Sequence, residues 1–162
     1  MTNSPIFSKQ LALDEYWKSI GGTVFLPGTN RAADRFARAQ FFIDAIPKTT
    51  DKNVIQGVPD QTYANQAVAS VLSVIRAVSV PIGLTTPDQP NIATTLWRTV
   101  ADQKNMNYFY DSATTPNTFW ISFQKLNFKE GSPALKLALD KGEVYSGEVS
   151  NELKPAEPFK FK

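Results

Sequence analysis

The chain has 162 residues, 42% hydrophobic and 20% charged, which is typical of a globular protein rather than a disordered, collagen-like or membrane-spanning one. Seventeen basic and fifteen acidic side chains leave a net charge of +2, without the Lys/Arg cluster of a nucleic-acid interface. Histidine and cysteine are both absent, which excludes a Ser-His-Asp triad, a cysteine nucleophile, a structural zinc site and disulfide bonds within these residues.

Two helices are predicted in the first third of the chain. Apolar residues recur at three- and four-residue intervals from Phe7 to Ile20, and Gly21 follows as a stop signal. The spacing predicts an amphipathic helix there. A second helix is predicted from Ala32 to Ile46, with Asn30 as its N-cap and Pro47 ending it.

A third helix is predicted from Asp60 to Ala77, after a polar surface loop at 48–59. Its apolar face continues toward Val80, but polar residues interrupt the stretch long before the ~20 apolar residues of a membrane span. The first ten residues have neither a basic nor an apolar region of the kind found in signal peptides. We therefore expect no membrane segment and no signal peptide, and the compartment stays open.

The second half of the chain is predicted to form antiparallel strands. The segments Thr95–Val100 and Asn107–Asp111 are rich in β-branched and aromatic residues and flank a polar turn, which predicts a hairpin. Thr118–Phe123 is predicted as a further strand, and Ser132–Lys162 as short strands with an extended arm. Helices followed by strands predict an α+β fold, which we assign to a single domain over residues 1–162.

Two short motifs stand out in the first 36 residues. Thr2-Asn3-Ser4-Pro5 is by itself a turn signal, because Asn and Ser bond to the local backbone and proline restricts the residue before it. Leu26-Pro27-Gly28 is followed by Asp34-Arg35-Phe36 at the start of the second helix. Taken alone, Arg35 is typical of a surface or salt-bridging arginine.

With their spacing, these motifs resemble the second half of the choloylglycine hydrolase family, the linear amide C–N hydrolases that include bile salt hydrolases and penicillin V acylases. The resemblance extends over nearly the whole chain. It implies part of a four-layer αββα sandwich of the N-terminal-nucleophile superfamily. It also implies that Asn3 stabilises the tetrahedral intermediate and that Arg35 lies beside the nucleophile, where its permanent charge favours an anionic transition state.

The family's first half, with its N-terminal cysteine nucleophile, has no counterpart in this sequence. One hypothesis is therefore the C-terminal part of an amide hydrolase, from a truncated or split gene or a processed precursor, that is inactive alone. The alternative is a non-catalytic binding or interaction module derived from this fold. Trp97 and Arg98 resemble part of the family's late hairpin, without a catalytic role carried over.

The resemblance also sets expectations about ligands and partners. We expect no cofactor and no metal, and the resemblance implies conjugated bile salts, penicillin V or N-acyl homoserine lactones as substrates. It implies an N-terminal half as partner, and a parent enzyme of the cytoplasm or periplasm. Half of a sandwich should expose apolar strand edges and faces, so we expect a chain that self-associates or depends on its partner.

Overall fold

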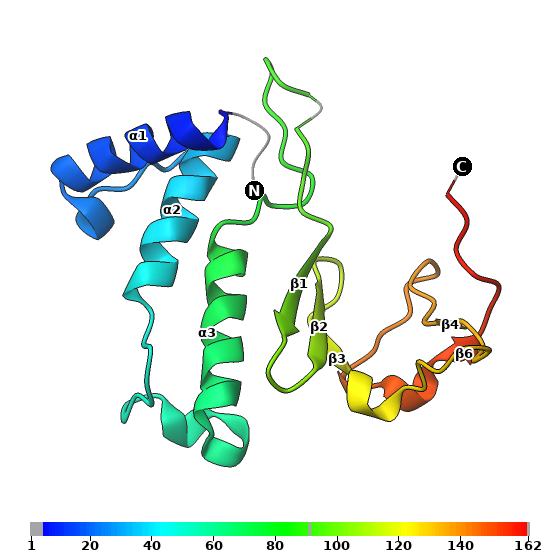
Figure 1. The fold of residues 1–162 in the computed structure, drawn as a ribbon. Coiled ribbons are helices and arrows are strands. Elements are labelled where there is room, and N and C mark those ends of the chain that lie inside the picture. Colours follow the sequence, from blue (N-terminus) through cyan, green and yellow to red (C-terminus); the bar gives the residue numbers. More distant parts are fainter. Residues whose placement is uncertain (1–4, 91, 162) are drawn as a thin grey trace. The chain divides into compact units, whose positions relative to one another are not determined.

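The computed structural model describes residues 5–90 and 92–161, so Asn3 lies outside the described residues. The chain forms two units, Met1–Thr95 and Leu96–Lys162, and each is described by itself. The first unit is helical and the second is built on strands (Figure 1). The predicted order of helices followed by antiparallel strands is confirmed, while the assignment of 1–162 to one domain stays a prediction.

Three helices form the first unit: α1 (Phe7–Ser19), α2 (Ala32–Ala45) and α3 (Tyr63–Ala77). They match the three predicted helices to within three residues at each end. The short 3-10 helices are η1 (Gly22–Val24), η2 (Ile55–Gly57) and η3 (Pro59–Gln61). Of the described helices, none combines the length and hydropathy needed to cross a membrane.

The start of α2 differs from the prediction. Its N-cap is Arg31 rather than Asn30, and the side chain of Arg31 makes no capping bond. The hydroxyl of Thr29 instead accepts a bond from the backbone N–H of Arg31 at 3.2 Å. By contrast, Thr62 caps α3 by accepting from the N–H of Asn65 at 3.3 Å. The predicted Asn30 cap is therefore absent, and Thr29, two residues before the N-cap, makes the side-chain bond at this end of the helix.

Helix α1 buries its polar side and exposes its apolar side, opposite to the amphipathic prediction. Gln10 and Asp14 are each 1% exposed, whereas Phe7 and Leu11 are 55% and 42% exposed. The amide Nε2 of Gln10 donates to Asp14 Oδ1 at 3.0 Å and to the carbonyl of Ala33 at 3.1 Å. These bonds join α1 to α2 and compensate part of the cost of burying two polar groups.

A second buried glutamine fixes the loop before α3. Gln66 is 1% exposed, and its Oε1 accepts from the N–H of Asp51 at 2.9 Å. Its Nε2 donates to the carbonyl of Thr49 at 3.1 Å. The buried apolar residues of this unit come from α2, α3 and the segments beside them, and include Ala37, Phe41, Val58, Val68, Leu72, Val74 and Val80. Helix α3, which has the clearest apolar periodicity, therefore also carries a buried polar side chain that bonds to the preceding loop.

The second unit contains a four-stranded sheet in the order β1-β2-β3-β5. Its strands are β1 (Trp97–Asp102), β2 (Asn107–Ser112), β3 (Thr118–Ser122) and β5 (Gly147–Glu148). The first three are antiparallel, which confirms the predicted hairpin and third strand, and β5 pairs parallel to β3. The remaining elements are β4 (Leu135–Lys136), β6 (Lys154–Pro155), η4 (Phe123–Lys125) and η5 (Ser150–Glu152).

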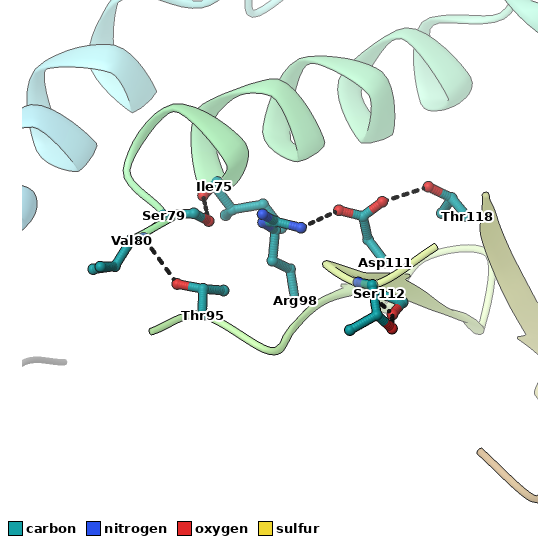
Figure 2. Close-up of polar contacts among 9 residues, drawn as sticks. Ile75, Ser79, Val80, Thr95, Arg98, Asp111, Ser112 and Thr118 are labelled. Carbon is teal, nitrogen blue, oxygen red and sulfur yellow. Dashed lines mark hydrogen bonds and ion pairs between the residues drawn. The ribbon is translucent and has the colours of Figure 1, made fainter. Parts of the chain in front are cut away.

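An ion pair joins the three antiparallel strands on one face of the sheet (Figure 2). Arg98 on β1 donates from a terminal guanidinium nitrogen to Asp111 Oδ2 on β2 at 2.9 Å, and Thr118 on β3 donates to Oδ1 at 2.8 Å. The side chains of Arg98 and Asp111 are only 17% and 4% exposed. One buried carboxylate therefore holds the register of all three strands.

Glu148 on β5 makes an exposed ion pair with Lys125. Its Oε1 also accepts a hydrogen bond from the backbone N–H of Ser150 at 2.9 Å. These interactions lower the pKa of Glu148 to about 2; the hydrogen bond from the Lys125 ammonium has the largest effect, and the bonds from Ser150 have the next largest. A lowered folded-state pKa adds stability above the ordinary value of 4.5, and this is lost as pH falls from there toward 2.

In Glu148→Gln, the free energy of unfolding should therefore fall less between pH 4.5 and 2 than it does in the unmodified chain. We expect a difference of about 1 kcal/mol or less, because the pair is solvent-screened. The measurement is the free energy of unfolding in urea across this pH range, with Glu143→Gln as control. An unchanged acid slope in Glu148→Gln would show that the pair contributes nothing.

Candidate functional site

Arg35 lies in the first turn of α2 and is half-buried. Its backbone N–H donates to the carbonyl of Arg31 at 3.0 Å, so the residue is held in regular helix. Its side-chain Nε donates to the carbonyl of Val78 at 2.7 Å. Val78 is the C-cap of α3, so this one bond ties the beginning of α2 to the end of α3.

The bond to Val78 fixes the orientation of the Arg35 guanidinium. Its planar fork cannot rotate freely once Nε is committed to a main-chain acceptor. The last carbonyls of a helix also carry partial negative charge, which favours a cation at that position. Arg35 is thus a permanently charged group with a defined direction, and not the mobile surface arginine that its sequence context alone suggests.

The loop before α2 is held against the helix by side chains from the helix itself. A terminal nitrogen of Arg38 donates to the carbonyls of Pro27 and Thr29, at 2.7 and 2.8 Å. The hydroxyl of Thr29 donates to the carboxylate of Asp34. Pro27 is itself buried. The Leu26-Pro27-Gly28 motif and the residues around Arg35 therefore form one locally bonded unit.

Aromatic packing supports the same turn of α2 from α1. The rings of Phe36 and Phe7 meet edge to face, with their centroids 6.3 Å apart. Ala37, the next residue of α2, has no exposed surface. Phe36 thus belongs to the packing of the helix pair, while its neighbour Arg35 reaches toward the end of α3.

The structure places Arg35 but cannot bring Asn3 to it, because Asn3 lies outside the described residues. The role of Asn3 stays a prediction. Trp97 is 58% exposed, and Arg98 is engaged by Asp111. Within the described ranges, no cluster of three or more acidic side chains is placed to hold a metal ion.

Sequence reasoning missed Arg38 as the residue that secures the loop. Arg38 is three residues after Arg35, and residues at this spacing are neighbours on the surface of a helix. This spacing was the signal in the sequence that could have pointed to Arg38. It also missed the partner of Arg35, because a backbone carbonyl from a helix end 43 residues away has no signature in side-chain patterns.

Comparison with known proteins places these motifs in a family. Residues 1–137 match the family model of linear amide C–N hydrolases, choloylglycine hydrolase family. The chain is 47% identical to penicillin V acylase of Pectobacterium atrosepticum, an alignment that covers 99% of this chain and 44% of that protein.

A solved structure supports the same relationship. The structure of penicillin V acylase from Agrobacterium tumefaciens matches with a TM-score of 0.81 and 53% identity. The match covers 100% of this chain and 48% of that one. The chain therefore spans about half the length of these relatives, and its fold is part of the N-terminal-nucleophile hydrolase sandwich, as predicted.

Proposed function

Because this chain belongs to the choloylglycine hydrolase family of linear amide C–N hydrolases, we propose that it supplies the C-terminal part of an amidase site. The observation that carries the proposal is the fixed Arg35 guanidinium, bonded through Nε to Val78 in the motif that the family match includes. The relatives named above are penicillin V acylases, which supports a linear amide as the substrate.

Arg35 stabilises negative charge in this proposal. Loss of a proton places negative charge on the nucleophile, and its attack on the amide carbonyl then moves that charge to the carbonyl oxygen. A guanidinium fixed before the reaction stabilises both without the cost of reorienting solvent. Its attachment to the end of α3 keeps the charge in place throughout the reaction.

Asn3 is proposed as the second supporting group. An amide side chain can donate hydrogen bonds to a developing oxyanion without titrating itself. The motif Thr2-Asn3-Ser4-Pro5 falls within the residues matched by the family model. This role rests on the family resemblance.

The nucleophile and its proton acceptor come from elsewhere in this proposal. In the family the nucleophile is an N-terminal cysteine, and these 162 residues contain no cysteine and no histidine. The 162-residue polypeptide should therefore not hydrolyse amides by itself. A complementary N-terminal part, equivalent to the half of the relatives that has no counterpart here, would complete the site.

The proposed substrates are amides with a hydrophobic acyl group: penicillin V, conjugated bile salts or N-acyl homoserine lactones. Penicillin V is the first to test, because both named relatives are penicillin V acylases.

The test is to assay release of phenoxyacetate from penicillin V by the purified chain, and by the chain co-expressed with the N-terminal part of the Agrobacterium tumefaciens relative. We expect no release above the uncatalysed rate from the chain and measurable release from the pair. Hydrolysis by the chain alone would contradict the proposal. A complex without activity toward any of the three substrate classes would favour a non-catalytic module.

A further inference from the structure

Two contacts flank Arg35 on α2, and both come from the beginning of α1. The amide Nε2 of Gln10 donates to the carbonyl of Ala33, two residues before Arg35, at 3.1 Å. The ring of Phe7 meets that of Phe36, directly after Arg35, with centroids 6.3 Å apart. In Figure 1 the beginnings of α1 and α2 accordingly lie against each other. The turn of α2 that carries Arg35 is therefore held by the first turns of α1.

The beginning of α1 also follows closely on the Asn3 motif. Asn3 precedes Phe7, the first residue of α1, by four positions in the sequence. The residues between them include Pro5, whose ring restricts φ, and Ile6, whose carbonyl accepts the first backbone bonds of the helix at 3.0 and 3.1 Å. A shift of α1 along or around α2 would therefore move the residues before α1 relative to Arg35.

The hydrogen bonds of Gln10 are buried but incomplete. Its Nε2 also donates to Asp14 Oδ1 at 3.0 Å, and both side chains are 1% exposed. Gln10 Oε1 and Asp14 Oδ2 are buried as well, and no donor in the part of the chain that the structure describes bonds to either oxygen. Buried acceptors without a donor cost free energy that apolar side chains of similar volume would avoid. The pair is therefore a poor source of stability.

Gln66 is a buried glutamine of the same unit with a different arrangement. It is also 1% exposed, but its Oε1 accepts from the N–H of Asp51 and its Nε2 donates to the carbonyl of Thr49. Both partners lie in the loop before α3, at the opposite end of this helix from Val78, the partner of Arg35. Gln66 thus stabilises a loop, whereas Gln10 bonds to the helix turn that carries Arg35.

We propose that Gln10 is a positioning residue for the amidase site. Its bond to Ala33 sets the separation of Asn3 and Arg35, and Asp14 orients the amide that makes this bond. The inference rests on the proposed function, in which Asn3 and Arg35 stabilise the same negative charge. Two groups that act on one oxyanion must keep their mutual geometry, and a displacement of about 1 Å can lower a rate by about 10²-fold. A buried network that is kept despite its energetic cost is expected where function needs one arrangement.

The test replaces the polar pair by apolar side chains of similar volume, Gln10→Met with Asp14→Leu. The variant chain is co-expressed with the N-terminal part of the Agrobacterium tumefaciens relative, and release of phenoxyacetate from penicillin V is measured. We expect kcat to fall about tenfold with KM within about twofold, because the change disturbs the transition state more than the bound amide. The melting temperature of the pair should stay equal or rise, because two unpaired acceptors are removed.

The matched control is Gln66→Met, which removes a buried glutamine that bonds only to the loop before α3. It should show the reverse result, a lower melting temperature and an unchanged kcat. Phe7→Ala is a second variant that weakens the other contact, at a position 55% exposed where folding is not at risk. It should lower kcat about threefold.

A double-mutant cycle separates positioning from a general effect on folding. In the Arg35→Gln background, Gln10→Met with Asp14→Leu should lower kcat by a further factor of no more than about two. The reason is that the separation set by Gln10 matters little once the guanidinium is absent. A residue that only stabilises the fold would lower kcat by the same factor in both backgrounds.

Full kcat in both Phe7→Ala and the Gln10→Met, Asp14→Leu variant would overturn the inference. Equal factors in the two backgrounds, or a loss of kcat in Gln66→Met as large as that in the polar-pair variant, would assign Gln10 a structural role only. If the apolar replacement prevents folding, full kcat in Phe7→Ala is sufficient to reject the inference. An unmodified pair that assembles but does not hydrolyse penicillin V would contradict the proposed function, and the role of Gln10 with it.

Discussion

Replacing Arg35 by glutamine should lower kcat/KM of the assembled hydrolase by about 10²–10³-fold, the usual cost of removing one fixed group that stabilises an oxyanion. The loss should fall mainly on kcat, because the charge acts on the transition state more than on the bound amide. The measurement is steady-state release of phenoxyacetate from penicillin V by the co-expressed pair.

Two further variants make this result specific. Arg31→Gln removes an exposed arginine one turn earlier and should leave kcat within about twofold. Arg35→Lys keeps the charge but loses the planar fork bonded to Val78, so it should recover only part of the activity. If Arg35→Gln retains full kcat while the pair is active, Arg35 has no role in the chemistry.

Replacing Asp111 by alanine should destabilise the sheet unit by about 3–5 kcal/mol, the cost of breaking a buried ion pair by removing one partner. The side chain is 4% exposed and accepts from both Arg98 and Thr118. The change therefore leaves a largely buried guanidinium without its carboxylate and removes a tie across three strands. Urea unfolding followed by tryptophan fluorescence measures the loss.

The matched control is Asp140→Ala, because Asp140 is an exposed aspartate of the same unit. Its effect should stay within about 0.5 kcal/mol. Asp111→Asn should lie between the two, since an amide oxygen can still accept a hydrogen bond but cannot neutralise Arg98. A loss below about 1 kcal/mol in Asp111→Ala would mean that solvent or other groups replace the ion pair.

The secondary structure was predictable because local signals agree with the fold. The periodicity of α3 and the alternation of β1 and β2 around a polar turn gave elements within a few residues of those observed. Glycine and proline also predicted where helices end. These features depend on residues close together in the chain, which is why one sequence was enough.

Which face of α1 is buried could not be predicted from local signals. The pattern of Phe7 and Leu11 suggested an apolar inner face, yet the helix buries Gln10 and Asp14. The reason is tertiary, because Gln10 finds an acceptor in the carbonyl of Ala33 on a different helix. Hydrophobic pattern predicts burial only where no polar partner or second surface competes for the helix face.

The candidate site was partly accessible from the sequence. A spaced motif within the residues matched by the family model singled out Arg35, whose role in the site stays a prediction, and its bond to Val78 needed the fold. The inference that another part of the protein completes the site came from chemistry, since no residue type in the sequence supplies a thiol or an imidazole.

The most direct test of the account is penicillin V hydrolysis by three samples at equal concentration: the chain, the N-terminal part of the Agrobacterium tumefaciens relative, and the two co-expressed. Release of phenoxyacetate is expected from the co-expressed pair only, and it should be lost when the cysteine that the family resemblance implies at the N-terminus of the relative's part is replaced by alanine. Release by the 162-residue chain alone, or by a pair without that cysteine, would contradict it.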